Sequence, residues 1–173
     1  MGMGKGLGMA EQPLWAPSRE RVAASQVMAF LKQVNARHDL DLDGYPALHL
    51  WSVRHPSLFW DQVWDFCGVI GEKGERVLID GGKMPGAAFF PDARLNFAEN
   101  LLRHSGSGAA MIFRGEDKKS YRLTWDELRA LVSRLQQALR AEGVRPGDRV
   151  AAMMPNLPET IALMLAVTSL GAI

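Results

Sequence analysis

The sequence predicts an α/β protein in which a helical N-terminal part is followed by a β-hairpin, a helix and a strand–helix unit. Apolar residues recur at helical spacing before residue 103, and two β-like runs flank a charged turn between residues 109 and 125. Residues 149–154 form a short, nearly all-apolar run, which is typical of a strand covered on both faces. At 173 residues the chain has the length of one domain, or of a small domain and part of another.

The composition argues against several classes of function. The 20 Lys and Arg residues nearly balance the 19 Asp and Glu residues, so there is no electrostatic case for binding nucleic acid or an anionic membrane. The single cysteine, Cys67, cannot form an internal disulfide, which favours a reducing compartment, and we predict a cytoplasmic protein. The Gly-rich start lacks a signal-peptide core, and the apolar stretch of residues 160–173 is too short to span a membrane.

Two amphipathic helices are predicted in the N-terminal part. Ser18 can cap a helix over residues 19–37, with Ala23, Val27, Phe30, Leu31 and Val34 on one face. A second helix is predicted over residues 55–68, with an apolar stripe of Phe59, Trp60, Val63, Trp64 and Cys67. We interpret this stripe and Trp51 as a Trp-rich corner packed on a larger body. An aromatic cage for a ligand is the less favoured alternative, because aromatic residues at helical spacing usually bury area.

The middle of the chain contains one possible phosphate loop. Gly81, Gly82 and Lys83 follow a β-like run at residues 76–80, but Met84-Pro85 comes next and no helix opens there, which favours a turn. A short helix is then predicted with Asn96 and Glu99 at capping-box spacing. Its inward-facing residues would be Ala98, Leu101 and Leu102. The polar stretch 103–108 is the best candidate for a linker.

The next stretch predicts a hairpin and a strongly capped helix. Residues 109–115 and 121–125 read as partner strands around a turn at 116–120. Thr124 and Glu127 form a capping box for the following helix, and Gly143 ends it. The buried stripe of this helix is predicted to contain Leu128, Leu131, Val132, Leu135, Ala138 and Leu139. Its arginines are interpreted as a solvated face rather than an anion site.

The closing helix is predicted to be apolar on most sides. Asn156 is expected to cap it with Glu159 at the reciprocal position, and Gly171 to end it. Its large apolar residues do not fit one stripe: Ile161, Leu163, Met164, Leu165, Val167 and Leu170. A helix that is apolar on most sides is normally covered by neighbouring elements on most sides. The parallel strand that should follow a strand–helix unit is absent from the sequence. We therefore expect an incomplete domain that self-associates. The alternative is a small complete domain that buries this helix in a dimer interface.

No catalytic, cofactor-binding or metal-binding residue is predicted. His38, His49, His55 and His104 lie apart without ligand spacing, and Cys67 has no partner motif. Asp39, Asp41 and Asp43 resemble the start of a calcium loop, but the Glu that such a loop needs at its end is missing.

Four sequence segments, in this order along the chain, resemble those of a known family. They are PLWAPSRERVAASQVMAFLKQVN (13–35), HLWSVRHPSLFWDQVWDF (49–66), MPGAAFFPDARLNFAENLLR (84–103) and RPGDRVAAMMPNLPETIALMLAVTSLGAI (145–173). Together they resemble the N-terminal part of acetoacetyl-CoA synthetases, within the adenylate-forming acyl-CoA synthetase superfamily. The third segment is shared in looser form with acetyl-CoA and propionyl-CoA synthetases, and the opening segment favours the acetoacetyl branch.

The resemblance implies a ligase that joins acetoacetate to CoA with Mg-ATP through an acyl-adenylate, releasing pyrophosphate and then AMP. Its catalytic and nucleotide motifs are absent here, so the chain by itself is expected to be inactive and to bind no ATP, Mg²⁺ or CoA. The Gly-rich start predicts a disordered leader at 1–16. The resemblance implies an N-terminal segment at 17–105 and the beginning of an AMP-binding domain at 106–173. An acetyl- or propionyl-CoA synthetase fragment and a non-enzymatic interaction module remain the alternatives.

Overall fold

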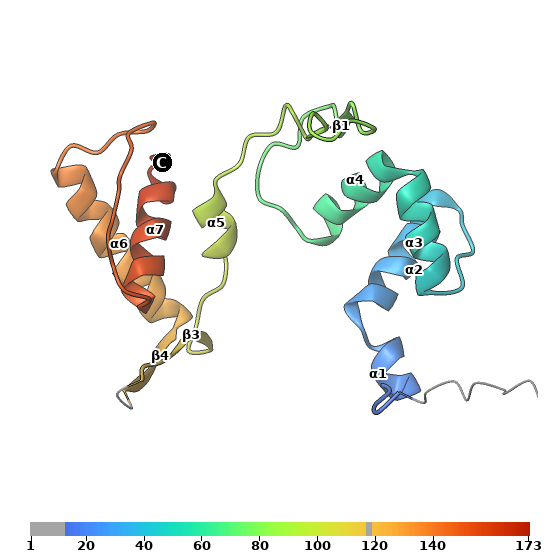
Figure 1. Ribbon diagram of the computed structural model, residues 1–173, viewed down its shortest axis with the longest axis horizontal. Helices are drawn as coiled ribbons and strands as arrows, with labels where there is room; N and C mark the ends of the chain where they lie inside the picture. The colour runs from blue at the N-terminus through green and yellow to red at the C-terminus, as the bar shows by residue number, and fades with distance from the viewer. Residues whose placement is uncertain (1–12, 117–118) are drawn as a thin grey trace, which may run out of the picture. The chain divides into compact units, whose positions relative to one another are not determined.

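The computed structural model describes residues 13–116 and 119–173. The chain forms two compact units, of which the first ends at Phe66 and the second begins at Cys67 (Figure 1). Residues 1–12 of the predicted leader lie outside the described part of the chain. Within that part, no helix is long and apolar enough to cross a membrane.

The first unit contains four helices where the sequence predicted two. They are α1 (Arg19–Ala23), α2 (Gln26–His38), α3 (Tyr45–Arg54) and α4 (Pro56–Phe66). The prediction of one helix over residues 19–37 was wrong, because Ser25 adopts extended backbone and its hydroxyl accepts a hydrogen bond from the Met28 N–H. A serine offers the chain a new N-cap at this point, which interrupts the helix. Ser18 caps α1 as predicted, whereas Ala23 and Val27 are exposed.

The helix α3 was not predicted. Gly44 is the N-cap of α3 and Pro46 lies in its first turn. Proline is well tolerated there because the first N–H groups of a helix have no partner inside the helix.

The core of the first unit is aromatic. Its buried members are Phe30, Leu31, Val34, Leu48 and Trp51. The ring of Phe30 makes edge contacts with Phe59 and Phe66, with centroids 5.7 and 5.2 Å apart. Packing rather than a ligand cage is therefore confirmed. The predicted stripe on α4 was partly wrong, since Gln62 and Trp64 are its buried residues whereas Trp60 and Cys67 are exposed.

The second unit begins with a small two-stranded sheet and a short helix. Strands β1 (Leu78–Ile79) and β2 (Ala88–Phe89) pair antiparallel, and α5 (Phe97–Leu101) follows. Asn96 caps α5 by accepting a hydrogen bond from the Glu99 N–H at 3.1 Å. Ala98 is fully buried and Leu102 packs on the core, but Leu101 is exposed, contrary to prediction.

The predicted hairpin and its helix are present. Strands β3 (Ala109–Arg114) and β4 (Ser120–Thr124) pair antiparallel, and α6 (Trp125–Ala141) follows. Part of the predicted turn, residues 117–118, lies outside the described residues. Thr124 and Glu127 make both hydrogen bonds of the capping box. The stripe is confirmed except at Ala138, which is exposed.

The last helix packs between its neighbours in the second unit. Helix α7 (Pro158–Ser169) lies against α6 and α5, and the shared core contains Ala98, Leu128, Val132, Ala162, Leu165 and Ala166 (Figure 1). Its N-cap is Leu157, without a side-chain cap, so the prediction of Asn156 as the cap was wrong. Gly171 follows the helix at φ 73°, as a helix-ending glycine does.

Residues 149–154 form no assigned strand, which contradicts the prediction. A strand is defined by its ladder partners. Within the described residues only Ile173 bonds to this segment, with the Val150 N–H donating to the Ile173 carbonyl at 2.8 Å.

Candidate functional site

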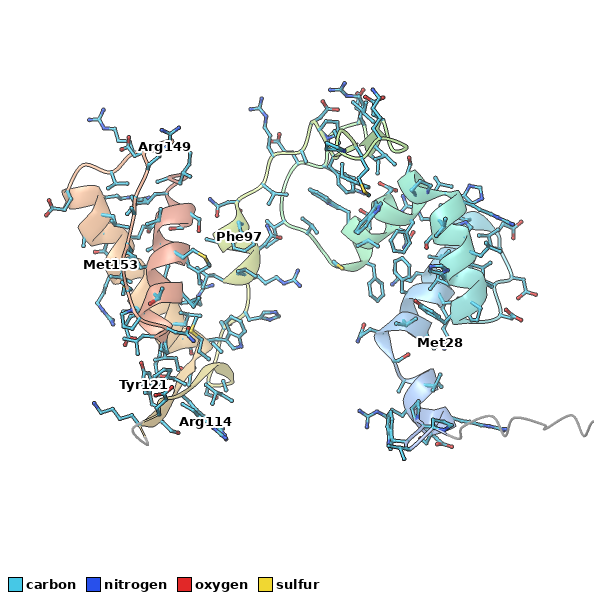
Figure 2. All side chains as sticks on the ribbon, viewed as in Figure 1. Met28, Phe97, Arg114, Tyr121, Arg149 and Met153 are labelled. Atoms are coloured by element: carbon cyan, nitrogen blue, oxygen red, sulfur yellow. The ribbon has the colours of Figure 1, made fainter. Side chains whose placement is uncertain are left out.

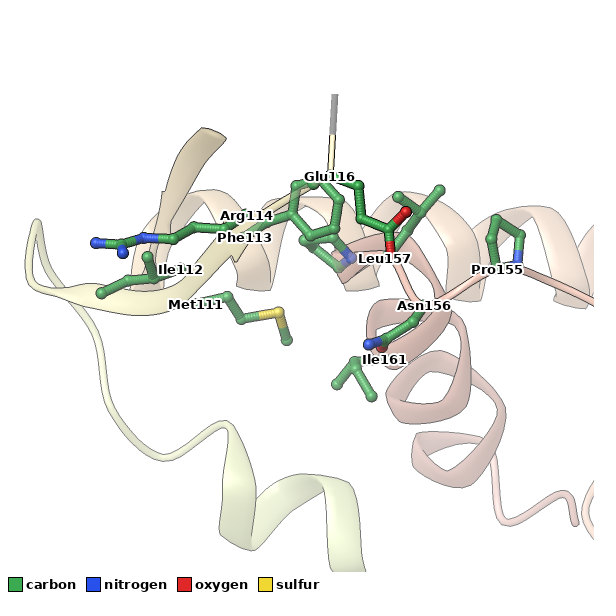
Figure 3. A pocket seen from close by; sticks show the side chains of 11 residues that line it. Met111, Ile112, Phe113, Arg114, Glu116, Pro155, Asn156, Leu157 and Ile161 are labelled. Atoms are coloured by element: carbon green, nitrogen blue, oxygen red, sulfur yellow. The ribbon is translucent and has the colours of Figure 1, made fainter. Parts of the chain in front are cut away.

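A cleft of the second unit lies between β3 and the start of α7. It has a volume of about 1070 Å³, and Figure 3 shows Met111 from β3 and Ile161 from α7 among its lining. The remaining lining comes from the end of β3 and from residues 155–158. The two sides of this cleft are at least 39 residues apart in the sequence, since the lining runs from 111 to 116 and from 155 to 161.

The lining of this cleft is mostly apolar. Its polar side chains are Arg114 and Glu116, at the end of the hairpin, and Asn156, before α7 (Figure 3). The described lining offers no cysteine, serine or histidine, so it holds no nucleophile with an adjacent base.

A tyrosine–glutamate contact joins the hairpin to α7 in this unit. The Tyr121 hydroxyl donates to the Glu159 carboxylate, with oxygen–oxygen distances of 3.1 and 3.2 Å. Tyr121 also stacks obliquely on Phe113, its partner across the ladder, at 5.2 Å between ring centroids. Partial desolvation, followed by the hydrogen bond to Glu159, raises the pKa of the Tyr121 phenol above its ordinary value.

A smaller apolar groove lies between the segment 149–154 and α7. It has a volume of about 200 Å³ and is lined by Val150, Ala152, Thr160, Leu163, Met164, Val167, Thr168 and Ile173. Methyl and thioether groups dominate this lining, which is the surface that a further strand or helix covers.

The glycine turn does not fit a nucleotide phosphate. The Lys83 ammonium pairs with the Asp80 carboxylate at 2.8 Å, and the Lys83 N–H donates to the Asp80 carbonyl. The residues that follow form turns rather than a helix. A phosphate loop needs converging N–H groups at a helix start, and here the lysine charge is already matched locally. The interpretation as a turn is confirmed.

The histidines and the cysteine do not come together. His38 ends α2 beside Trp51, and His104 stacks on Trp125 at 5.1 Å between ring centroids. Cys67 is a free, exposed thiol. In the part of the chain that the structure describes, no group of three or more His, Cys, Asp or Glu residues is placed to hold a metal ion.

Comparison with known proteins shows which family the chain resembles. Residues 45–101 match the model of the acetyl-coenzyme A synthetase N-terminus, and residues 97–173 match that of the AMP-binding enzymes. An acetoacetyl-coenzyme A synthetase from Rhizobium meliloti is 64% identical over 95% of this chain. The chain belongs to the acetoacetyl-CoA synthetase family. This confirms the resemblance carried by the four segments.

Other relatives agree with this membership. The structure of the acetoacetyl-CoA synthetase from Streptomyces lividans superposes with a TM-score of 0.83 at 39% identity, over 94% of this chain and 26% of that one. A malonamoyl-CoA synthetase from Penicillium aethiopicum is 38% identical over 94% of this chain and 23% of its own length. The fold is thus that of the N-terminal part of an adenylate-forming acetoacetyl-CoA synthetase. The chain spans about a quarter of the length of these relatives.

Sequence reasoning missed the cleft between β3 and α7. No local pattern could have revealed it, because its two sides meet only through the packing of α7 on α6.

Proposed function

We propose that this chain is the N-terminal part of an ATP-dependent acetoacetate–CoA ligase. The complete protein would convert acetoacetate, ATP and CoA to acetoacetyl-CoA, AMP and pyrophosphate, with Mg²⁺ accompanying the nucleotide. The observation that supports this most is the 64% identity to the Rhizobium meliloti enzyme over 95% of this chain. The free thiol of Cys67 agrees with a cytoplasmic location, which we include in the proposal.

In this proposal the chain has a structural role. The segment 17–105 precedes the AMP-binding domain, and residues 106–173 begin that domain with the β3–β4 hairpin, α6 and α7. One feature supports this role: the two family models overlap at residues 97–101, shortly before the proposed division. Limited proteolysis of the complete protein would test the division, with first cleavage expected within the polar stretch 103–108.

Substrate-dependent ATP–pyrophosphate exchange by the complete protein tests the proposed activity. We expect acetoacetate to support exchange with at least about tenfold higher kcat/KM than acetate or propionate, a difference of about 1.4 kcal/mol in transition-state binding. Preference for acetate or propionate would favour the alternative synthetases. The 173-residue chain is the matched control, and exchange by this chain alone would refute its structural role.

We also propose that the chain, when isolated, self-associates through α7. Ile161 and Met164 are 40% and 41% exposed on this helix. Ile161 lines the β3–α7 cleft and Met164 lines the apolar groove. Sedimentation velocity over a range of concentrations would test this. Replacing both residues by lysine should shift the chain toward monomer, whereas Val27→Lys, on an equally exposed position of α2, should not. A concentration-independent monomer in the unsubstituted chain would contradict the proposal.

A further inference from the structure

Helix α5 and its N-cap supply two asparagines that link distant parts of the second unit. The Asn100 side chain accepts from the Ile70 N–H at 2.8 Å and donates to the Ile70 carbonyl at 2.9 Å. The Asn96 side chain accepts from the Glu99 N–H and donates, at 3.0 Å, to the carbonyl of Thr168 in the last turn of α7. Asn100 also donates to the Asn96 carbonyl at 3.0 Å. These hydrogen bonds form one continuous chain from Ile70 to Thr168.

The part of the chain that precedes β1 is held by further hydrogen bonds from the residues around α5. Arg103, just after the helix, donates to the Cys67 and Gly68 carbonyls at 2.8 and 3.0 Å. The backbones of Glu72 and Arg94 exchange both N–H···O hydrogen bonds, at 2.8 and 2.9 Å. This part of the chain is therefore attached through α5 and the residues that flank it.

Helix α5 is too short to be stable by itself. It has five residues, whereas isolated helices shorter than about 12–15 residues are marginal in water. Ala98 is its buried residue, whereas Phe97, which Figure 2 labels on this helix, and Leu101 are 53% and 43% exposed. The folded state of α5 therefore depends on the hydrogen bonds made by Asn96 and Asn100.

We propose that α5 is a conformational coupling element between the segment 67–95 and the end of α7. Release of the Ile70 contact unfolds α5 and withdraws the Asn96 donor from Thr168, and release of Thr168 frees the segment 67–95 in turn. The physical requirement for such coupling is an element with two states whose equilibrium both ends bias, and the folding of α5 provides it.

The position of α5 in the chain gives this coupling its significance. The five residues of α5 are those on which the two family models overlap, so the helix lies where the matched N-terminal segment meets the matched AMP-binding part. Opening on one side of this junction is thereby felt on the other. The coupling is a property of the second unit and does not depend on the proposed ligase activity.

Amide hydrogen exchange in the complete protein tests the coupling. Asn96→Asp and Asn96→Ser both keep an oxygen that caps a helix, but they lack the donor to Thr168. The Ile70 amide, which bonds to Asn100 rather than to Asn96, should exchange at least about tenfold faster in both variants. Phe97→Leu, at an exposed position of the same helix, is the matched control and should leave this rate unchanged. An unchanged Ile70 rate in either Asn96 variant would overturn the proposal.

The reverse direction provides a second test, because coupling between two sites is reciprocal. Asn100→Asp keeps an acceptor for the Ile70 N–H but lacks the donor to the Ile70 carbonyl. The Gly171 amide, which donates to the Thr168 carbonyl at 3.0 Å, should then exchange faster, whereas the amides in the middle of α6 should keep their rates. An unchanged Gly171 rate, or an equal acceleration in α6 as global destabilisation would cause, would overturn the proposal.

The two asparagines should behave as one unit. If α5 unfolds when either contact is lost, combining Asn96→Asp with Asn100→Asp should accelerate Ile70 exchange by no more than about twofold beyond the larger single effect. Two independent contacts would instead multiply the single effects, and that result would contradict the coupling.

Discussion

The Tyr121 hydroxyl and the Glu159 carboxylate are hydrogen-bonded although 38 residues separate them in the sequence. Tyr121 lies on β4 and Glu159 in the first turn of α7, where a carboxylate is also favoured by the helix dipole. This contact fastens the hairpin to α7 in the second unit.

Removing the carboxylate should lower the pKa of Tyr121. In a Tyr45→Phe background, which leaves a single tyrosine, Glu159→Gln should shift the ultraviolet phenolate titration toward lower pH. The pKa should remain above its ordinary value, because desolvation is the larger cause of the shift. Since the folded-state pKa is raised, this contribution to stability is present below pH 10 and is lost as the pH rises through the folded-state pKa. An unchanged titration would show that Glu159 does not act on Tyr121.

Loss of the α6 cap should destabilise the second unit. Thr124→Ala removes the hydroxyl that accepts from the Glu127 N–H at 3.2 Å, and we expect a loss of about 1 kcal/mol in the free energy of unfolding. Urea denaturation followed by circular dichroism measures it. Thr124→Ser keeps the hydroxyl and is the control. Equal losses in the two variants would show that the methyl group, not the cap, stabilises the helix.

The same cap predicts that the stability of the folded protein decreases at acidic pH. Hydrogen bonds from the Thr124 N–H and hydroxyl lower the pKa of the Glu127 carboxyl below its ordinary value of 4.5. A lowered folded-state pKa means that the stabilisation is present above pH 4.5 and is lost as the pH falls through the folded-state value. Glu127→Gln should therefore flatten the acid limb of a plot of urea midpoint against pH. If the limb keeps its slope, other carboxylates such as Asp92, whose pKa Arg76 lowers, account for it.

Gly171 should tolerate substitution less well than Gly143. Both have positive φ, at 73° and 87°, so alanine is strained at either position. At Gly171 the added methyl group would also meet Pro146 Cβ at 3.4 Å, whereas nothing lies within 4 Å at Gly143. We expect Gly143→Ala to cost about 1 kcal/mol and Gly171→Ala to cost more, measured by thermal unfolding. Equal costs would mean that Pro146 moves aside freely.

Core packing on α7 should be confined to one of its sides. Leu165 is 2% exposed, and Leu165→Ala should cost about 2–5 kcal/mol in the free energy of unfolding. Met164, the adjacent residue, is 41% exposed, and Met164→Ala should cost well under half as much. Denaturant titration of the two variants compares them directly. A similar loss at Met164 would indicate that its side is covered in solution, as self-association would cause.

Local chemistry explains the predictions that were confirmed. Ser18, Asn96 and Thr124 each accept a hydrogen bond from an N–H three residues further along, so the sequence alone identifies them as caps. Gly143 and Gly171 follow the ends of their helices at positive φ, which glycine adopts without steric cost. These interactions act within a single turn and do not depend on neighbouring elements.

The predictions that were wrong involved competing local choices or packing. Ser25 and Asn156 are both able to cap, yet only Ser25 does so, and the Asn156 side chain lies in the lining of the β3–α7 cleft instead. Leu101 and Ala138 have the right spacing to face inward but are exposed. Spacing alone does not say how wide a face the neighbouring helices cover.

The sequence by itself determined the family, the type of most elements and their ends, because identity, caps and periodicity are properties of short stretches. Only the tertiary structure decided which sides of α7 are buried, where the cleft opens and how Ile173 pairs with the segment at Val150. Burial and backbone pairing join residues that are distant along the chain. They depend on where whole elements pack, and residues 149–154 have the composition of a strand but become one only when a partner supplies the hydrogen bonds.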